Sequence, residues 1–264
     1  MKKEIKVAVG SNLDEIKNRG GYFEKFKNAP IPDNELLTNL GLFINRQSLS
    51  RVIFMNELYQ KIINVNGVVM EFGVRWGQNL SLFSNFRGMY EPYNYTRKII
   101  GFDTFSGFPS IHKNDGTKDF IQKGAYGVSE NYENYLDDIL AYHEQESPIS
   151  HKKKYELIKG DATKTIKEYL TNNPQTIISF AYFDFDIYEP TKVCLEAILP
   201  HLTKGSIIAF DELNDPNFPG ETIAFKEVLG LNNYEIKRSP LNPLISYIEF
   251  WKILKLLFMF GIYR

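Results

Sequence analysis

Residues 67–82 read Gly-Val-Val-Met-Glu-Phe-Gly-Val-Arg-Trp-Gly-Gln-Asn-Leu-Ser-Leu, and this stretch decides the expected fold. The apolar run Val68 to Phe72 stands between two glycines, which is typical of a buried parallel strand. Gly73 and Gly77 bracket a turn, and Asn79 begins an apolar spacing that predicts a helix. A strand, a glycine turn and a helix in this order can hold a ligand against the backbone amides of a helix N-terminus.

The spacing of this turn is Glu-x-Gly-x-x-x-Gly, which differs from the dinucleotide fingerprint Gly-x-Gly-x-x-Gly. Glu71, two residues before the first glycine, suits a cationic or hydroxyl-rich ligand better than a pyrophosphate. Taken alone, the stretch fits a tight strand-to-helix turn in any α/β protein equally well. The rest of the chain decides between these interpretations.

From residue 67 onward, predicted strands alternate with predicted helices, which indicates an α/β fold with a parallel sheet. The strands are expected at 68–72, 98–102, 155–159, 176–183 and 206–210. Helices are expected at 79–87, 163–170, 188–201 and 221–229. Residues 234–237 and 245–250 could pair as a terminal antiparallel hairpin.

Three segments lie outside this alternation. Residues 1–64 are expected to form a polar arm, or a short helix, followed by two capping helices, and residues 65–250 to form the core. The interval 104–153 is aromatic and polar, and its length favours a functional loop or lid over an ordinary connector. The apolar tail 251–264 is expected to dock on the domain or on a dimer partner, with a membrane-surface helix as the alternative.

Composition excludes several classes of protein. The 264 residues carry 31 basic and 32 acidic side chains, and a net charge of −1 gives no electrostatic case for nucleic acid. A single cysteine, Cys194, excludes an intramolecular disulfide framework and a cysteine-built zinc site. The N-terminus has no signal-peptide pattern, and no run reaches the roughly 20 apolar residues of a membrane span. We therefore expect a cytoplasmic protein without a transmembrane segment.

Acidic residues follow several predicted strands at the point where each strand ends. They are Asp103, Asp161, Asp184 with Asp186, and Asp211 with Glu212. Because ligands bind outside the carboxyl ends of the strands in open α/β sheets, these acids are expected to converge on one crevice. A single acid of this kind is usually a helix cap or a turn residue, but several in register indicate a site.

Two of these acids suit a nucleoside. Asp103 ends the second predicted strand, where a carboxylate can accept hydrogen bonds from both ribose hydroxyls. Asp161 opens a helix and could face an adenine edge while it caps that helix. In both cases the alternative is a cap or turn residue with no ligand.

The remaining acids suit a metal ion. Asp184 and Asp186 are two residues apart, and Asp211-Glu212 ends the next predicted strand. Such an oxygen-only set favours Mg²⁺, or less specifically Ca²⁺ or Mn²⁺. A bound ion could lower the pKa of a substrate hydroxyl while a nearby carboxylate removes the proton. A row of helix caps at an ordinary sheet edge is the alternative.

Together these motifs resemble class I S-adenosylmethionine-dependent methyltransferases, and more narrowly the sugar O-methyltransferases of the TylF/MycF type. The matching residues are Glu-Phe-Gly-Val-Arg-Trp-Gly at 71–77, Phe-Asp-Thr-Phe-Ser-Gly-Phe-Pro at 102–109, Lys-Gly-Asp at 159–161, Asp-Phe-Asp-Ile-Tyr-Glu-Pro-Thr at 184–191 and Phe-Asp-Glu at 210–212. They occur in the family's order over about 65–215. The resemblance implies a Rossmann-like sheet of seven strands with the last one antiparallel.

The resemblance also implies methyl transfer from S-adenosylmethionine to a hydroxyl of a sugar-containing acceptor. Asp186 matches the position expected for the base, with Asp184 beside it, and Mg²⁺ would be held by Asp184, Asp211 and Glu212. The residues expected at the cofactor are Glu71, Gly73, Arg75, Gly77, Asn79, Asp103, Ser106, Asp161 and Ala162. A homodimer is the expected assembly.

Two departures from the family pattern bear on these expectations. The family usually has two aspartates where this chain has Asp211-Glu212, so Glu212, the expected third metal ligand, differs from the family's residue. Pro190 replaces a serine, which the first turn of a helix tolerates. Two other functions stay open: a metal-dependent hydrolase or nucleotide-sugar enzyme on a related sheet, and a glycan-binding protein without activity.

Overall fold

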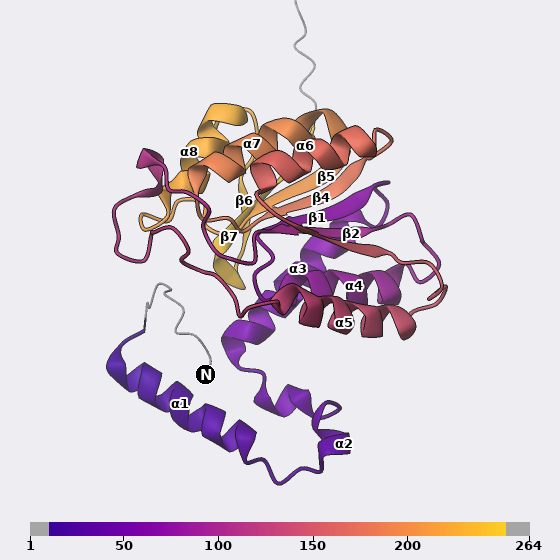
Figure 1. Ribbon diagram of the computed structural model, residues 1–264, viewed down its shortest axis with the longest axis vertical. Helices are drawn as coiled ribbons and strands as arrows, with labels where there is room; N and C mark the ends of the chain where they lie inside the picture. The colour runs from indigo at the N-terminus through magenta and orange to yellow at the C-terminus, as the bar shows by residue number, and fades with distance from the viewer. Residues whose placement is uncertain (1–10, 252–264) are drawn as a thin grey trace, which may run out of the picture.

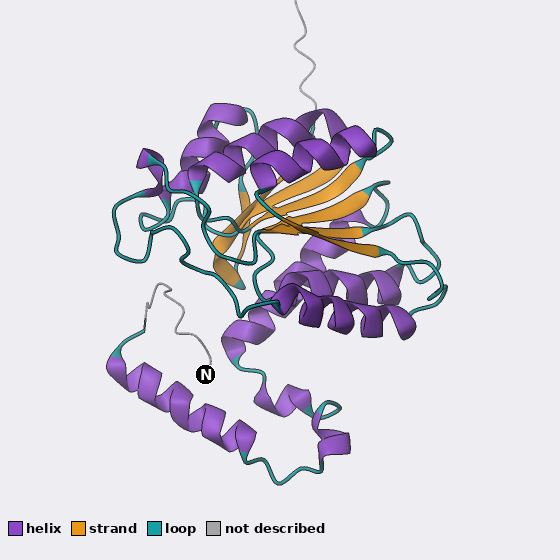
Figure 2. Ribbon diagram, in the orientation of Figure 1, coloured by secondary structure: helices purple, strands orange, loops and turns teal. Residues whose placement is uncertain are grey.

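A seven-stranded sheet forms the centre of the computed structural model, which describes residues 11–251 (Figures 1 and 2). Its strand order is β3-β2-β1-β4-β5-β7-β6. The strands are β1 (Val68–Phe72), β2 (Ile99–Asp103), β3 (Tyr155–Lys159), β4 (Ile178–Phe183), β5 (Leu202–Phe210), β6 (Lys237–Ser239) and β7 (Asn242–Glu249). Strands β1 to β5 pair in parallel, whereas β7 is antiparallel to both β5 and β6. The predicted fold class is confirmed, including the reversed last strand.

Helices cover both faces of the sheet (Figure 1). Helices α6 (Ala162–Asn172), α7 (Tyr188–Ile198) and α8 (Pro219–Val228) lie on one face, with the short helix η3 (Leu199–His201) after α7. Helices α3 (Arg46–Ile62), α4 (Gln78–Tyr90) and α5 (Tyr132–Gln145) lie on the other. A hydrophobic core lies on each face of the sheet, and successive strand residues point into opposite cores. Val69 packs with α3 and α4, whereas Met70 packs with α6 and α7. The buried thiol of Cys194 belongs to the second core.

The N-terminal segment stands apart from the sheet (Figure 1). It consists of α1 (Leu13–Lys27), α2 (Asp33–Leu36) and the 3₁₀ turn η1 (Leu40–Phe43), and none of their side chains is buried. Asn12 and Glu15 form a capping box that starts α1. Of the two helices expected between residues 34 and 64, only α3 reaches the core, where Phe54, Leu58 and Tyr59 are buried.

The interval 104–153 is not loop throughout. Residues 104–131 are irregular apart from η2 (Lys113–Asp115), whereas α5 covers the sheet with Leu136 and Leu140 in the core. These leucines are four residues apart, a helical spacing obscured by the many aromatic and charged neighbours. The irregular part of this interval is therefore shorter than the segment expected to be a loop or lid.

Two further points concern the ends of the chain and the membrane. The apolar tail expected at 251–264 lies, apart from Trp251, outside the described residues. Within residues 11–251, no helix has both the length and the hydropathy to cross a membrane.

Candidate active site

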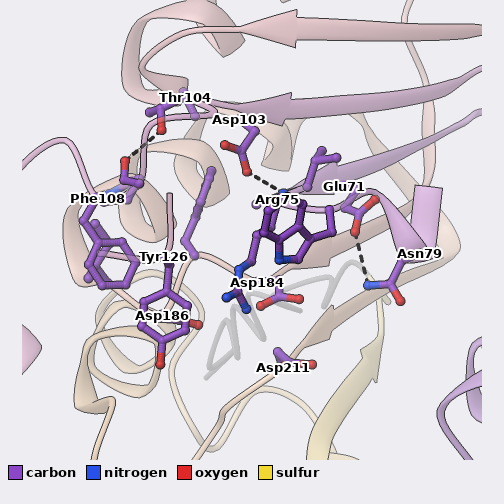
Figure 3. A pocket seen from close by; sticks show the side chains of 18 of the residues that line it. Glu71, Arg75, Asn79, Asp103, Thr104, Phe108, Tyr126, Asp184, Asp186 and Asp211 are labelled. Atoms are coloured by element: carbon purple, nitrogen blue, oxygen red, sulfur yellow. Dashed lines mark hydrogen bonds between the residues drawn. The ribbon is translucent and has the colours of Figure 1, made fainter. Parts of the chain in front are cut away.

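A cavity of about 340 Å³ lies at the carboxyl ends of β1, β2, β4 and β5 (Figure 3). The chain runs from β1 outward through β2 and β3, then returns to β4 and continues outward through β5. The cavity therefore lies at the switch point between β1 and β4, where such sheets bind ligands. The expected site residues that line it are Glu71, Gly73, Arg75, Asn79, Asp103, Asp161, Ala162, Asp184, Asp186, Asp211 and Glu212. Gly77 and Ser106 are not part of this lining.

The glycine turn after β1 depends on close backbone contact. Gly73 has φ +96°, and a Cβ there would lie 2.0 Å from the carbonyl oxygen of Asp184. Only glycine fits where the ends of β1 and β4 come this close. Gly77 has φ +76° and precedes the first residue of α4, and a Cβ there would meet the side chain of Leu136. Gly77 thus shapes the turn from outside the cavity.

Asp103 ties this turn to the end of β2. Its carboxylate accepts a hydrogen bond from the backbone N–H of Arg75 at 2.8 Å (Figure 3) and another from the backbone N–H of Phe105 at 2.5 Å. Burial raises the pKa of Asp103, although these N–H groups oppose that effect. Each carboxylate oxygen has a second lone pair, so the side chain can still accept hydrogen bonds from a ligand.

Glu71 is an incompletely paired carboxylate at the end of β1. Its side chain is 1% exposed, one oxygen accepts a hydrogen bond from the Asn79 amide at 3.1 Å, and the other has no protein partner. Burial, and then the charge of Asp184, raise the pKa of Glu71 well above its ordinary value. A buried acceptor of this kind beside a cavity indicates a place for a donor or a cation.

Arg51 is at the centre of the acidic end of the cavity, and sequence reasoning missed it. Its Nη2 atom lies 3.2 Å from an oxygen of Asp184 and 3.2 Å from an oxygen of Asp211. Tyr182 also hydrogen-bonds Asp211. Arg51 comes from α3, upstream of every motif, and its only signal is its position one turn before the buried Phe54 and Met55.

A second group of acids adjoins this ion pair. Asp186 is 5% exposed, and its φ is +62°. Burial, and then the negative charge of Glu221 in the first turn of α8, raise the pKa of Glu212. The backbone N–H of Glu212 donates to Glu221, yet each of these two glutamates has one buried oxygen without a protein partner. Burial, and then the charge of Glu212, raise the pKa of Asp186 well above its ordinary value. The sequence did not predict Glu221 as a site residue, because it belongs to α8, which only the tertiary fold brings to the carboxyl ends of the strands.

These donors suit a hard cation, but they are not preassembled around one. Among the residues that the structure describes, no set of three or more histidine, cysteine, aspartate or glutamate side chains is arranged to hold a metal ion. Asp184 and Asp211 instead converge on Arg51. The oxygen-only chemistry and the unpaired oxygens of Glu212 and Glu221 nevertheless fit a divalent ion.

Comparison with solved structures identifies the family. A structure of CalS11, described as a calicheamicin methyltransferase, is 42% identical, covers 94% of this chain and 97% of its own, and has a TM-score of 0.89. The chain belongs to the class I S-adenosylmethionine-dependent O-methyltransferases. This confirms the resemblance drawn from the sequence motifs and the expectation of an enzyme.

Two further structures are similar to this methyltransferase. An apo structure of CalS11, described as a TDP-rhamnose 3'-O-methyltransferase of calicheamicin biosynthesis, is 41% identical, covers 92% of this chain and 96% of its own, and has a TM-score of 0.81. The O-methyltransferase NovP is 16% identical, covers 76% of this chain and 79% of its own, and at a TM-score of 0.56 shares the fold. Comparison with protein-family models found no match, and neither did a search of curated proteins.

Aromatic side chains of the methyltransferase line the opposite wall of the cavity. Phe108 and Tyr126 stack with their ring centroids 5.2 Å apart, and the guanidinium of Arg75 lies 5.0 Å from the Tyr126 ring (Figure 3). Both rings come from the irregular segment 104–131. Flat apolar faces of this kind can stack on a base or on the apolar face of a sugar.

Asp115 fixes the same segment to the acidic end of the cavity. Its buried carboxylate accepts hydrogen bonds from the backbone N–H of Tyr188 at 2.6 Å and of His112 at 2.6 Å. Tyr188 is the first residue of α7, and the residue before it makes no side-chain cap. Asp115 therefore caps α7 from a distant loop and helps to hold the preceding Asp186 in place.

The stability of the ligand-free methyltransferase is expected to fall as pH rises from about 6.5 to about 9. Burial raises the pKa of Asp184 to about 7 and that of Glu212 to about 9, with Asp211 and Glu221 adding to these shifts. The folded state therefore keeps protons that the unfolded chain has released, so the free energy of unfolding decreases with increasing pH in this window. Thermal unfolding in chelator at several pH values measures this, and a melting temperature that rises across the window would contradict it.

Proposed function

We propose that this methyltransferase transfers the methyl group of S-adenosylmethionine to a hydroxyl of a sugar, with a nucleotide-linked sugar as its acceptor class. The observation that carries the proposal is one cavity that joins the Gly73 turn and Asp103 to the acids Asp184 and Asp186. The acceptor class follows the description of CalS11 as acting on TDP-rhamnose.

The cofactor would occupy the part of the cavity next to β1 and β2. Glu71 and the Gly73 turn would face its methionine part, since the unpaired Glu71 oxygen can accept from an ammonium group. The Asp103 carboxylate would accept hydrogen bonds from the ribose hydroxyls. Asp161 caps α6 by accepting hydrogen bonds from Thr163, so it would help to shape the adenine site together with Ala162.

In this proposal Asp186 removes the proton from the acceptor hydroxyl. Bound S-adenosylmethionine supplies an electrophilic methyl group on a sulfonium. Asp186 must be deprotonated to act, and the positive charge of the sulfonium would favour its carboxylate form. Burial opposes that charge by raising the pKa of Asp186, so the carboxylate would still be a stronger base than an exposed one. The stacked rings of Phe108 and Tyr126 would hold the sugar while the reacting atoms are in line.

We further propose that Mg²⁺ assists this reaction. Asp184, Asp211 and Glu212 would hold the ion, and Glu221, next to Glu212, has a further buried oxygen without a protein partner. A divalent ion there would lower the pKa of the acceptor hydroxyl. The expected homodimer is also part of the proposal, and the exposed apolar side chains Leu13, Phe23, Leu37 and Leu42 of the N-terminal segment offer surface for it.

A methyl-transfer assay with TDP-rhamnose and S-adenosylmethionine tests the proposed function. Mass spectrometry should detect an acceptor that has gained one methyl group, with formation of S-adenosylhomocysteine. Excess chelator should suppress turnover, and added Mg²⁺ should restore it. Full activity in excess chelator would refute the metal, whereas turnover of a sugar nucleotide without S-adenosylmethionine would indicate a different enzyme.

A further inference from the structure

The acidic end of the cavity holds more negative groups than it has cations to pair with them. Burial, and then the charges of neighbouring acids that include Asp211, raise the pKa of Asp184, Asp186, Glu212 and Glu221. Within residues 11–251, Arg51 is the cation at ion-pair distance from this group, and the charge of Arg75 also favours the ionised forms of Asp184 and Asp186. Arg51 therefore offsets repulsion that would otherwise oppose folding of this edge.

One guanidinium nitrogen bridges two carboxylates. Arg51 Nη2 lies 3.2 Å from Asp184 and 3.2 Å from Asp211, and it also donates to the hydroxyl of Tyr182 at 3.1 Å. Burial alone would lower the pKa of Arg51, but Tyr182 and the two aspartates raise it above its ordinary value. Arg51 consequently stays charged at every pH at which the protein is folded.

The same side chain reaches the cofactor end of the cavity. Arg51 Nε donates to the amide oxygen of Asn79 at 3.2 Å, and the Asn79 amide nitrogen donates to Glu71 at 3.1 Å. This chain of hydrogen bonds joins the two aspartates to the glutamate proposed to receive the cofactor's ammonium group. A movement of Arg51 would thus change hydrogen bonds at both ends of the cavity.

We infer that Arg51 is a built-in counter-ion that competes with the divalent cation for Asp184 and Asp211. The inference rests on the metal part of the proposed function. Two cations cannot share the same two carboxylate oxygens without strong repulsion, so entry of the ion displaces Arg51 from them. Arg51 accordingly keeps the acids assembled in the absence of metal and weakens metal affinity.

Calorimetric titration with Mn²⁺ and with Mg²⁺ tests this inference on the full-length chain. Arg51→Gln is expected to bind either ion at least about 10-fold more tightly than the unchanged protein, because a buried positive charge next to the ligands has been removed. Arg46→Gln is the matched control, since Arg46 is exposed on the same helix and the variant has the same net charge. Its metal affinity should stay unchanged. Equal or weaker binding by Arg51→Gln would overturn the inference.

Thermal unfolding provides a second readout. In chelator, Arg51→Gln should melt at a lower temperature than the unchanged protein. Added Mg²⁺ should raise the melting temperature of Arg51→Gln by more than it raises that of the unchanged protein. If Arg51→Gln does not fold, Arg51→Lys takes its place and should show a metal affinity no weaker than that of the unchanged protein, because a single ammonium group makes fewer of these contacts. Weaker metal binding by Arg51→Lys would overturn the inference.

Titration with S-adenosylhomocysteine separates the failure of this inference from that of the proposed function. If neither the unchanged protein nor Arg51→Gln binds metal while both bind S-adenosylhomocysteine, the inference and the metal part are refuted and the methyltransferase site stands. If S-adenosylhomocysteine also fails to bind, the proposed cofactor site is refuted as well.

Discussion

Asp186→Asn is expected to lower kcat by about 10³-fold while S-adenosylhomocysteine binds with nearly unchanged affinity. Asparagine keeps the size of the side chain but cannot take up the proton of the acceptor hydroxyl. Asp186 lies at the acidic end of the cavity with 5% of its surface exposed, and it is not one of the residues proposed to hold the cofactor. The loss should therefore fall on turnover and leave cofactor binding intact.

Steady-state kinetics and calorimetry on the same preparation measure the two effects. Asp138→Asn, on the exposed face of α5, is the matched control and should retain full activity. The rate of the unchanged protein should rise with pH as Asp186 loses its proton, and this rise should be missing in the variant. Turnover above one tenth of normal would assign the base to another residue.

Asp103→Ala is expected to weaken S-adenosylhomocysteine binding by at least about 10²-fold. Two hydrogen bonds from ribose hydroxyls to a charged acceptor contribute about 1.5–3 kcal/mol each. The substitution also removes the acceptor for the N–H groups of Arg75 and Phe105, which loosens the turn that faces the cofactor. Calorimetry measures the affinity, and thermal unfolding shows whether the variant is folded.

Asp119→Ala serves as the control for this second variant. Asp119 is exposed in the same segment that follows β2, so the change removes the same charge without touching the cavity. Its affinity for S-adenosylhomocysteine should equal that of the unchanged protein. A folded Asp103→Ala variant with unchanged affinity would remove Asp103 from the cofactor site.

Much of the fold could be predicted from the sequence because its signals are local. The apolar run before Gly73 predicts β1. The acids that follow the strands predict the edge of the sheet at which the carboxyl ends of β1, β2, β4 and β5 line one cavity. Strands β1 and β3 have the predicted bounds, and β2 and β4 start within two residues of them. Helix α5 was missed because aromatic and charged residues mask its apolar positions.

Arg51, which lines the cavity, and two residues that support its wall from behind could not be predicted in this way. Arg51, Asp115 and Glu221 lie on α3, on a loop turn and on α8, and only tertiary packing brings them to the strand ends. None is part of a motif with a characteristic spacing. Their contacts cross 73 residues in the case of Asp115 and 133 residues between Arg51 and Asp184, far beyond any local pattern.

Calorimetric titration of the full-length chain with S-adenosylhomocysteine, with and without Mg²⁺, is the most direct test of the proposed cofactor site. We expect binding of one molecule per chain with micromolar affinity. Such a result would reduce the remaining question to the acceptor sugar. The absence of binding under both conditions would contradict the assignment of the cavity and leave its acids to a different chemistry.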